Sequence, residues 1–515
     1  MKFIKNLFIA LLILTISIIF IVWLFAKSVK PETIKAYINT QLSTLTHKSS
    51  KVEGDISWQI VPRPGIKITH LRIGNEINHE NYFVKLDSLL FNLKITPLLR
   101  GKLVFNELNV DGFEVTINPD ATPSLNPPSQ PQSKENFSIK AEETDQFAIE
   151  QILLTHGKIT ILKNQKIVTL SGLQIGAKQF NLQHALFPLQ FKTNLAVITD
   201  NEKIVKAHAN FTGNVSLSSS LFKDPVFILQ NTPLEGQLSL RDIKLNQLKL
   251  AQVSAHIKTK PGVLFLNPLT LNLYNGESVG DLKYEFASAK LIINQTATNL
   301  DSSRLISDLL TIPLIKGKMD FSLHMQANLQ QTNWQDNLAG NGNLTIKDGF
   351  INFINLNKII QETSDKINKL LTTPHSDVAQ VLKLAPFSNP DYFIGSTPFK
   401  LLTFQYHLQD GILQSNSLVL QTDKLQLKGV GSLNLKDNNI DSHLSVQVTL
   451  TDPEVEKIQQ LLGGSFPIVV KGNLTKPLVL PDLQQINPIL TKAWLQETLT
   501  KPVKQIQDTI KTIFD

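Results

Sequence analysis

The sequence predicts a mainly β protein with peripheral helices, preceded by one transmembrane helix. Two patterns support this prediction. Apolar and polar residues alternate with a period of two through most of the chain, which is typical of strands that bury one face. One long, uncharged apolar stretch lies near the N-terminus. Hydrophobic residues make up 42% of the 515 residues and charged residues only 18%, so the chain can form a sizeable core and is not a charged, disordered tail.

The apolar stretch is Leu7–Ala26, in which Thr15 and Ser17 are the polar positions. At 1.5 Å per residue a helix of this length crosses roughly 30 Å, the thickness of a hydrocarbon core. A cleaved signal peptide is the competing interpretation. Its apolar region is usually shorter, and no small residue pair for cleavage follows here. We expect a retained anchor, with these positions along it: Leu7, Ile13, Ile18, Trp23 and Ala26.

Charge and cysteine content predict the cellular location of the residues that follow the anchor, which we call the body. Four of the seven surplus positive charges fall in residues 1–30, which leaves a nearly neutral body that is poorly suited to nucleic acid. The chain has no cysteine, which argues against a disulfide-rich secreted protein and suits a bacterial periplasm. The short N-terminus favours translocation of the long body. We therefore expect a single-pass protein of the bacterial inner membrane with its body in the periplasm.

The periodicity divides the chain into six parts. Helical patterns occur at 356–371 and 376–385, and another begins at Asp452 as N-cap with Pro453 in the first turn. The expected parts are an anchor (1–30), a helix and first β segment (31–117), a Pro-rich linker or loop (118–146), a middle β segment (147–300), a C-terminal β segment with helical insertions (301–482) and an amphipathic helix (483–515).

Strand alternation also predicts which residues form the apolar face. The polar neighbours Glu114, Thr116, Ser445 and Gln447 should face water. The pattern alone leaves open whether the apolar face lines an open groove or packs inside a closed sandwich. The candidate positions on the apolar face are Phe113, Val115, Ile117, Leu444, Val446, Val448 and Leu450.

Glycine-containing pairs recur before short alternating segments, and we interpret them as turns. The intervals between them are irregular, which indicates duplicated units with insertions and not a strict solenoid. The pairs are Asp111-Gly112, His156-Gly157, Pro261-Gly262, Asp348-Gly349 and Asp410-Gly411.

No motif for chemistry stands out. The chain has no HExxH metal motif, no P-loop and no GxSxG nucleophile motif. The glycines at 340 and 342 fit a turn better than a dinucleotide site, because position 345 is Thr. We therefore expect no enzyme activity, no catalytic or metal site and no cofactor. A hydrolytic site assembled from distant residues is the alternative.

Several phrases together resemble the AsmA family of bacterial envelope proteins, which is related to TamB-like and chorein-type bridge-like lipid carriers. They are VEGDISWQIVPRPGIKI from Val52, KPGVLFLNPLTLNLYNGESVGDLKYEF from Lys260, GNGNLTIKDGFINFINL from Gly340 and DGILQSNSLVLQTDKLQLKGVGSLNL from Asp410. The resemblance covers nearly the whole chain. It departs from the family at 120–146, where a Pro-rich segment is inserted.

The resemblance implies a long twisted antiparallel β-sheet curled into an apolar groove that conducts phospholipid acyl chains. It also implies a role in phospholipid transport and outer-membrane homeostasis, with the inner membrane, the outer membrane and outer-membrane proteins as partners. The alternative is an assembly factor that binds nascent β-strands of outer-membrane proteins at an open sheet edge. For the segment 483–514 two interpretations remain open. It either caps the end of the sheet or acts as a mobile helix at the groove mouth.

Overall fold

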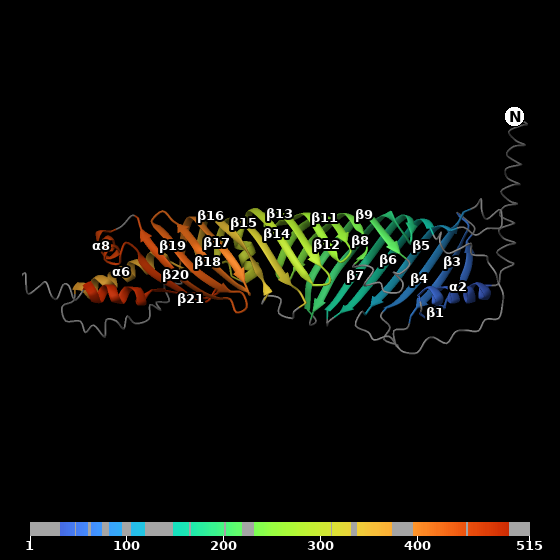
Figure 1. The fold of residues 1–515 in the computed structure, drawn as a ribbon, viewed down its shortest axis with the longest axis horizontal. Helices are drawn as coiled ribbons and strands as arrows, with labels where there is room; N and C mark the ends of the chain where they lie inside the picture. The colour runs from blue at the N-terminus through green and yellow to red at the C-terminus, as the bar shows by residue number, and fades with distance from the viewer. Residues whose placement is uncertain are drawn as a thin grey trace, which may run out of the picture. The chain divides into compact units, whose positions relative to one another are not determined.

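The computed structural model describes residues 31–46, 48–59, 63–74, 82–94, 105–118, 148–163, 166–199, 202–218, 231–310, 312–330, 337–372, 395–449 and 452–493. These residues contain 22 strands and few helices, which confirms the predicted mainly β fold (Figure 1). The chain forms two compact units, Met1–Leu271 and Asn272–Asp515. Within the described ranges, no helix is both long and apolar enough to span a membrane. The predicted anchor lies outside them.

Unit 1 begins with helix α2 (Pro31–Thr46) and a divided edge strand. The two short strands β1 (Ser50–Val52) and β2 (Ile56–Gln59) both pair with β3 (Gly65–Ile73). Strands β4 (Tyr82–Leu93) and β5 (Phe105–Ile117) continue the antiparallel ladder. The sheet therefore starts as the sequence predicts.

The next pairing is parallel, which is an exception to the predicted antiparallel sheet. Strand β6 (Ala148–Lys163) runs in the same direction as β5, with Val110 opposite Leu154. Parallel neighbours need a long crossover, and residues 118–147 separate the two strands in sequence. The antiparallel ladder then resumes through β7 (Lys166–Asn181), β8 (Gln183–Thr199), β9 (Glu202–Ser218), β10 (Leu234–Leu245) and β11 (Leu248–Lys260). Strand β12 (Val263–Leu273) contains the boundary between the units.

In unit 2 every pairing is antiparallel and joins strands that are consecutive in sequence. The strands are β13 (Gly276–Glu285), β14 (Lys290–Asp301), β15 (Ile315–Asn328), β16 (Ala339–Asn352), β17 (Ser396–Gln409), β18 (Ile412–Gln421), β19 (Leu425–Asn434), β20 (Asn439–Val448), β21 (Phe466–Asn473) and β22 (Leu478–Pro481). The helices in the described part of this unit are α5 (Ser302–Leu310), α6 (Leu356–Thr372), α8 (Pro453–Leu461) and a helix at 483–493.

The helical predictions are largely confirmed where the structure describes them. Helix α8 has Asp452 as its N-cap, whose side chain accepts a hydrogen bond from the backbone N–H of Glu454, and its first residue is Pro453. Helix α6 matches the predicted pattern at 356–371. Helix α5 was not predicted, because nine residues contain too few periods to stand out. The pattern at 376–385 lies outside the described residues.

The glycine-containing pairs are only partly turns. Asp410-Gly411 joins β17 to β18 with both φ angles positive (53° and 76°), as a two-residue hairpin requires. Pro261-Gly262 is also a turn. The turn interpretation is wrong for the other three pairs: Asp111-Gly112, His156-Gly157 and Asp348-Gly349 lie inside strands β5, β6 and β16. Positive φ at Gly112, His156 and Asp348 marks local irregularities in these strands, since bulges use the same backbone region as turns.

Candidate functional site

The strand register of unit 1 assembles one continuous apolar row, which we call the unit 1 row. Each member lies directly opposite the next member on the neighbouring strand, from β3 to β11. No polar residue interrupts the row, so one face of these nine strands is apolar along its whole width. Its members are Ile68, Leu89, Val110, Leu154, Ile175, Phe191, Phe211, Leu238 and Ala255.

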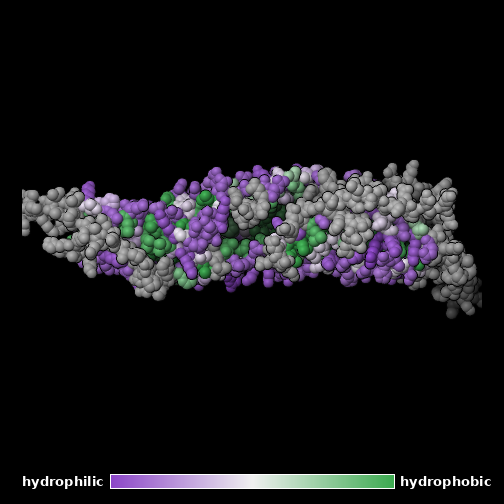
Figure 2. Space-filling model, turned by 90° about the horizontal axis from the view of Figure 1, so that it is seen from below, coloured by the Kyte–Doolittle hydropathy of each residue, from purple (hydrophilic) through white to green (hydrophobic). Residues whose placement is uncertain are grey.

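The unit 1 row is unevenly covered. Near its start, Ile38 and Leu42 of α2 pack against a buried cluster that contains Ile68, Leu89 and Val110. Further along, a second cluster is built from strand residues only, as far as the structure describes the chain. Four members of the row are partly exposed: Leu154, Ile175, Phe191 and Leu238. The first three pack against the same cluster as α2. Figure 2 shows hydrophobic residues in a hollow between hydrophilic margins on one side of the molecule.

Aromatic rings of this face lie against glycines of the neighbouring strand. A Cβ added at Gly157 would lie 2.0 Å from Cζ of Phe113, so the ring occupies the space that a side chain would need. Phe211 lies in the same way over the opposed glycines Gly213 and Gly236. Each ring therefore fills the space that a side chain at the glycine would need.

A corresponding row in unit 2, the unit 2 row, is completely buried. Its members are between 0% and 6% exposed. They belong to a cluster that includes Leu356, Ile359 and Ile367 of α6 and Ile458 of α8. Three helices therefore cover this face, because Ile486 and Leu490 of the helix at 483–493 join the same cluster. The row consists of Leu300, Met319, Ile346, Leu402, Leu420, Leu427, Val446 and Phe466.

The predicted face residues divide between the two units. In unit 1, Phe113 and Ile117 are buried and Val115 is partly exposed, whereas Glu114 is exposed and Thr116 partly exposed. In unit 2, Val446 is buried, Leu444 and Val448 are partly exposed, and Ser445 and Gln447 are exposed. Leu450 and the five anchor positions lie outside the described residues.

No residue of the unit 1 row was among the predicted positions. Phe191 and Leu238, for example, lie in segments that alternate as regularly as those that were chosen. Which of them lie side by side depends on register across several strands, and a single sequence does not contain that register.

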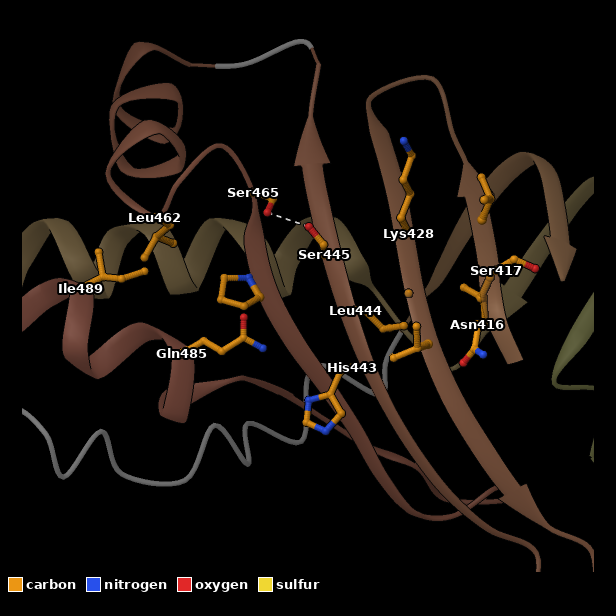
Figure 3. Close-up of a pocket in the computed structure, with 15 residues that line it drawn as sticks. Asn416, Ser417, Lys428, His443, Leu444, Ser445, Leu462, Ser465, Gln485 and Ile489 are labelled. Carbon is orange, nitrogen blue, oxygen red and sulfur yellow. Dashed lines mark hydrogen bonds between the residues drawn. The ribbon is translucent and has the colours of Figure 1, made fainter. Parts of the chain in front are cut away.

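A separate cavity of about 440 Å³ lies at the end of unit 2 (Figure 3). Its walls come from β18 to β21, from Leu462 and from Gln485 and Ile489 of the helix at 483–493. Its lining mixes the polar side chains of His443 and Ser445 with apolar ones. Ser445 donates a hydrogen bond to Ser465 across 2.7 Å. The described residues contain no group of three or more His, Cys, Asp or Glu side chains that could hold a metal ion.

Asp482 anchors the helix beside this cavity. Its side chain is only 5% exposed and lies 3.2 Å from Nδ1 of His443. It accepts hydrogen bonds from the backbone N–H of Gln484 and the side chain of Gln485. Burial alone would raise the pKa of Asp482, but the hydrogen bonds from Gln485 and His443 and from backbone N–H groups lower it overall. The carboxylate is thus the charged N-cap of the terminal helix.

The fold defines a class of protein: a chain of open, mostly antiparallel β-sheet whose apolar face is partly exposed in unit 1. The AsmA family model matches residues 1–239 and 229–418, and the chain belongs to the AsmA family. The resemblance found in the sequence is thereby confirmed. No curated protein and no solved structure matched the chain.

Proposed function

We propose that the chain supports phospholipid transport and outer-membrane homeostasis as an inner-membrane-anchored periplasmic protein whose apolar face shields acyl chains. The unit 1 row carries this proposal, because its apolar surface is continuous across nine strands and partly exposed in the middle. Family membership and an open sheet are compatible with a lipid-transport or envelope role.

The physical basis is the hydrophobic effect. Each Å² of apolar surface removed from water contributes about 25 cal/mol, so an acyl chain resting on Leu154, Ile175 and Leu238 is favoured over one in water. Binding of this kind needs no catalytic group.

Substitutions at two adjacent residues of β10 test the proposal. Leu238 belongs to the unit 1 row, whereas Ser239 alternates to the opposite face and pairs with Ser254. We expect Leu238→Asp to lower the amount of phospholipid that co-purifies with the full chain, because an acyl chain that covers the carboxylate removes it from water at a cost in free energy. Ser239→Asp should leave it unchanged. Equal lipid content in the two variants and in the parent chain would refute the proposal.

The alternative, strand addition by nascent outer-membrane proteins, would need an accessible edge. The edge strands that the structure describes are short. Strand β1 has three residues, and β2 and β22 have four each. Short edge strands offer few backbone groups for pairing. Crosslinks from barrel proteins to β22, with no lipid bound to the unit 1 row, would favour the alternative.

A further inference from the structure

The cavity of unit 2 has a floor on the face of the sheet opposite the unit 2 row. Four of its lining residues are each next in sequence to a member of that row, and because successive strand residues point to opposite faces, their side chains lie on the other face. The strand register places them directly side by side from β18 to β21. These floor residues are Val419, Lys428, Ser445 and Pro467.

Apolar side chains make this part of the face unlike an ordinary solvated strand face. Val419 and Pro467 belong to the floor, and Val430, also in the lining, is 45% exposed. Leu462, which follows α8, and Ile489 of the helix at 483–493 line the same cavity on the side away from β19 (Figure 3). A concave site with apolar walls and a few polar groups is typical of small-molecule binding.

Lys428 supplies a positive charge to the cavity. Its side chain is exposed, and its cross-strand neighbours Val419 and Ser445 are both uncharged. Among the residues that the structure describes, Lys428 forms no ion pair with a carboxylate. The described part of the chain therefore leaves this ammonium group available to an anionic ligand.

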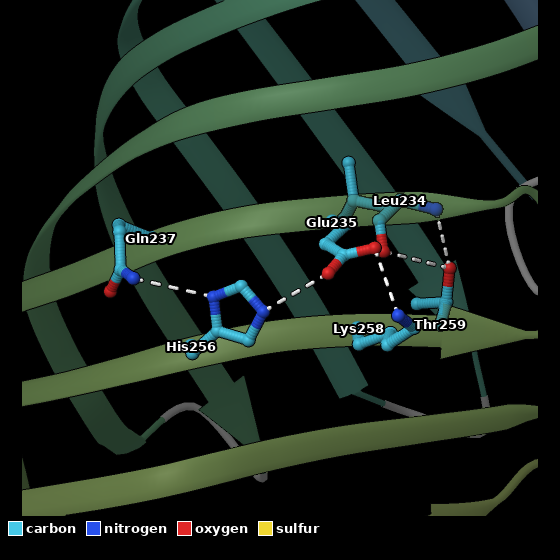
Figure 4. Close-up of polar contacts among 6 residues, drawn as sticks. All are labelled: Leu234, Glu235, Gln237, His256, Lys258 and Thr259. Atoms are coloured by element: carbon cyan, nitrogen blue, oxygen red, sulfur yellow. Dashed lines mark hydrogen bonds and ion pairs between the residues drawn. The ribbon is translucent and has the colours of Figure 1, made fainter. Parts of the chain in front are cut away.

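Two other lysines show how such a charge is balanced elsewhere. In unit 1 the register places Glu235 opposite Lys258, and Oε2 of Glu235 lies 3.0 Å from Nζ of Lys258 (Figure 4). The hydrogen bond from Lys258 is the main cause of the lowered pKa of Glu235. In unit 2, Nζ of Lys400 lies 2.7 Å from Oδ1 of Asp423. Lys428 gains no such attraction from the strands beside it, since opposite charges stabilise a cross-strand pair and its neighbours carry none.

Two hydroxyl groups beside Lys428 indicate what kind of anion fits. Ser445 is directly opposite Lys428, so their Cβ atoms are about 5 Å apart. The Ser445 hydroxyl donates to Ser465, whose own hydroxyl donates no hydrogen bond within the described ranges. A carboxylate has two acceptor oxygens, one for the ammonium group and one for this hydroxyl. A single ammonium group balances a single negative charge, which favours a carboxylate over a phosphate monoester that carries about two.

The charges at the other end of the cavity fix the orientation of such a ligand. Nδ1 of His443 lies 3.2 Å from Asp482, and its Nε2 lies 3.8 Å from Asp441. These carboxylates disfavour an anion at that end, so the anionic group belongs beside Lys428. Neighbouring strands lie about 4.8 Å apart, so an alkyl chain that starts at Lys428 on β19 crosses roughly 10 Å to reach Pro467 on β21. One extended chain of medium length covers this path.

We propose that the cavity of unit 2 binds a single-chain carboxylate amphiphile of the fatty-acid class. Its carboxylate pairs with Lys428 and accepts a hydrogen bond from Ser465, and its chain lies against Pro467 and Ile489. This site goes beyond the proposed function. It belongs to unit 2, it holds one small ligand, and it does not depend on whether the unit 1 row carries phospholipid.

The test uses the full chain in phosphatidylcholine nanodiscs and a decanoate probe with a photoreactive diazirine at its chain end. After illumination, peptide mass spectrometry locates the label, and titration of the probe gives its half-saturating concentration. We expect saturable label on the peptides that contain Leu462 or Ile489. Lys428→Gln should raise the half-saturating concentration about tenfold, because it removes the charge that pairs with the carboxylate. Lys428→Arg keeps that charge and should retain most of the binding.

Matched controls keep the result specific. Lys424→Gln removes another exposed lysine, just before β19 and outside the cavity lining, and it should change the half-saturating concentration by less than about twofold. Val430→Ser removes apolar wall and should raise it about threefold. Lys428→Gln should leave the melting temperature and the co-purified phospholipid unchanged, whereas Leu238→Asp should leave probe labelling unchanged. Failure of this proposal is thereby distinguished from failure of the proposed function.

Three outcomes would overturn the carboxylate site. The first is equal labelling of the parent chain and Lys428→Gln across the titration. The second is competition by decanol as strong as that by unlabelled decanoate, which would indicate an apolar cavity without recognition of charge. The third is stronger competition by decyl phosphate than by decanoate, which would indicate a phosphate site.

Discussion

The unit 1 row and the unit 2 row are built from the same kind of residue but are buried to different extents. Every member of the unit 2 row is at most 6% exposed, whereas Leu154, Ile175, Phe191 and Leu238 of the unit 1 row are partly exposed. Helices α6, α8 and 483–493 cover the unit 2 row. In the described part of unit 1, α2 is the only helix that contributes to a hydrophobic cluster, and it packs near the start of the row.

The difference shows that strand alternation determines only which face is apolar. Whether that face becomes a core or a surface depends on the segments that connect the strands. In unit 2 those segments contain amphipathic helices such as α6, with its isoleucines at 359, 360 and 367 on the buried side. An equally apolar strand face can therefore stabilise the fold in one unit and remain available to a ligand in the other.

The largest expected effect is the contrast between Val446→Asp and Leu238→Asp. Val446 is 0% exposed, so an unpaired carboxylate there should lower the free energy of unfolding of unit 2 by more than about 4 kcal/mol. Leu238 is partly exposed, and the same change should cost about 1 kcal/mol. Urea unfolding followed by hydrogen exchange in peptides of each unit measures both. Similar losses at the two sites would mean that the unit 1 row is a core as well.

A smaller loss is expected from Ile486→Ala. This side chain is 1% exposed in the cluster of unit 2, and its truncation should cost about 2–4 kcal/mol if the terminal helix is a structural cap. Gln484→Ala, exposed on the same helix, is the control and should have little effect. An unchanged melting temperature for Ile486→Ala would instead support a mobile helix at the mouth of a groove.

Gly157→Ala tests the aromatic packing of unit 1. The added Cβ would overlap the ring of Phe113, so we expect a loss of about 1–3 kcal/mol. Gly176→Ala on the next strand is the control, because an added Cβ there meets nothing within 4 Å. Thermal melting of both variants decides the point. Adding Phe113→Leu should recover part of the loss at Gly157, and failure to do so would exclude the ring as the cause.

The smallest expected effect is that of Asp482→Ala, about 1 kcal/mol at neutral pH from the lost N-cap. Because the pKa of Asp482 is lowered in the folded state, its stabilisation is complete above the ordinary value of 3.8 and disappears as the pH falls below it. Parent and variant should therefore converge in stability under acidic conditions. A difference that persists at acid pH would mean that the ionised carboxylate is not what stabilises the helix.

The sequence predicted the fold class well, since period-two alternation directly reports a half-buried strand. The helix N-cap at Asp452 and Pro453 could also be predicted, because both residues act locally. Two features of the strands could not be predicted from the sequence. The parallel step between β5 and β6 leaves the same alternation as an antiparallel one. The pairs at His156 and Asp348 have positive φ beside register shifts, which has the same sequence signature as a turn.

The candidate site was predicted only as a kind of surface. Phe113 and Val446 were assigned to an apolar face. Alternation could not predict that the Phe113 ring packs against Gly157, or that helices cover Val446. Contacts between strands were likewise hidden. Lys206 and Lys244, for example, become neighbours only through the register of β9 with β10, and a one-residue shift would separate them onto opposite faces.

The parallel step between β5 and β6 has a consequence for how the chain folds. Hairpins form from neighbouring segments and close small loops, so each antiparallel pair can assemble as soon as its second strand has been synthesised. The pairing of β5 with β6 requires closure across residues 118–147, the costliest entropic step in the described ladder of unit 1. Strands β1–β5 with α2 can therefore complete as an early folding unit. We expect the rest of the ladder to nucleate separately at β6 and β7 and to join strands β1–β5 through the pairing of β5 with β6.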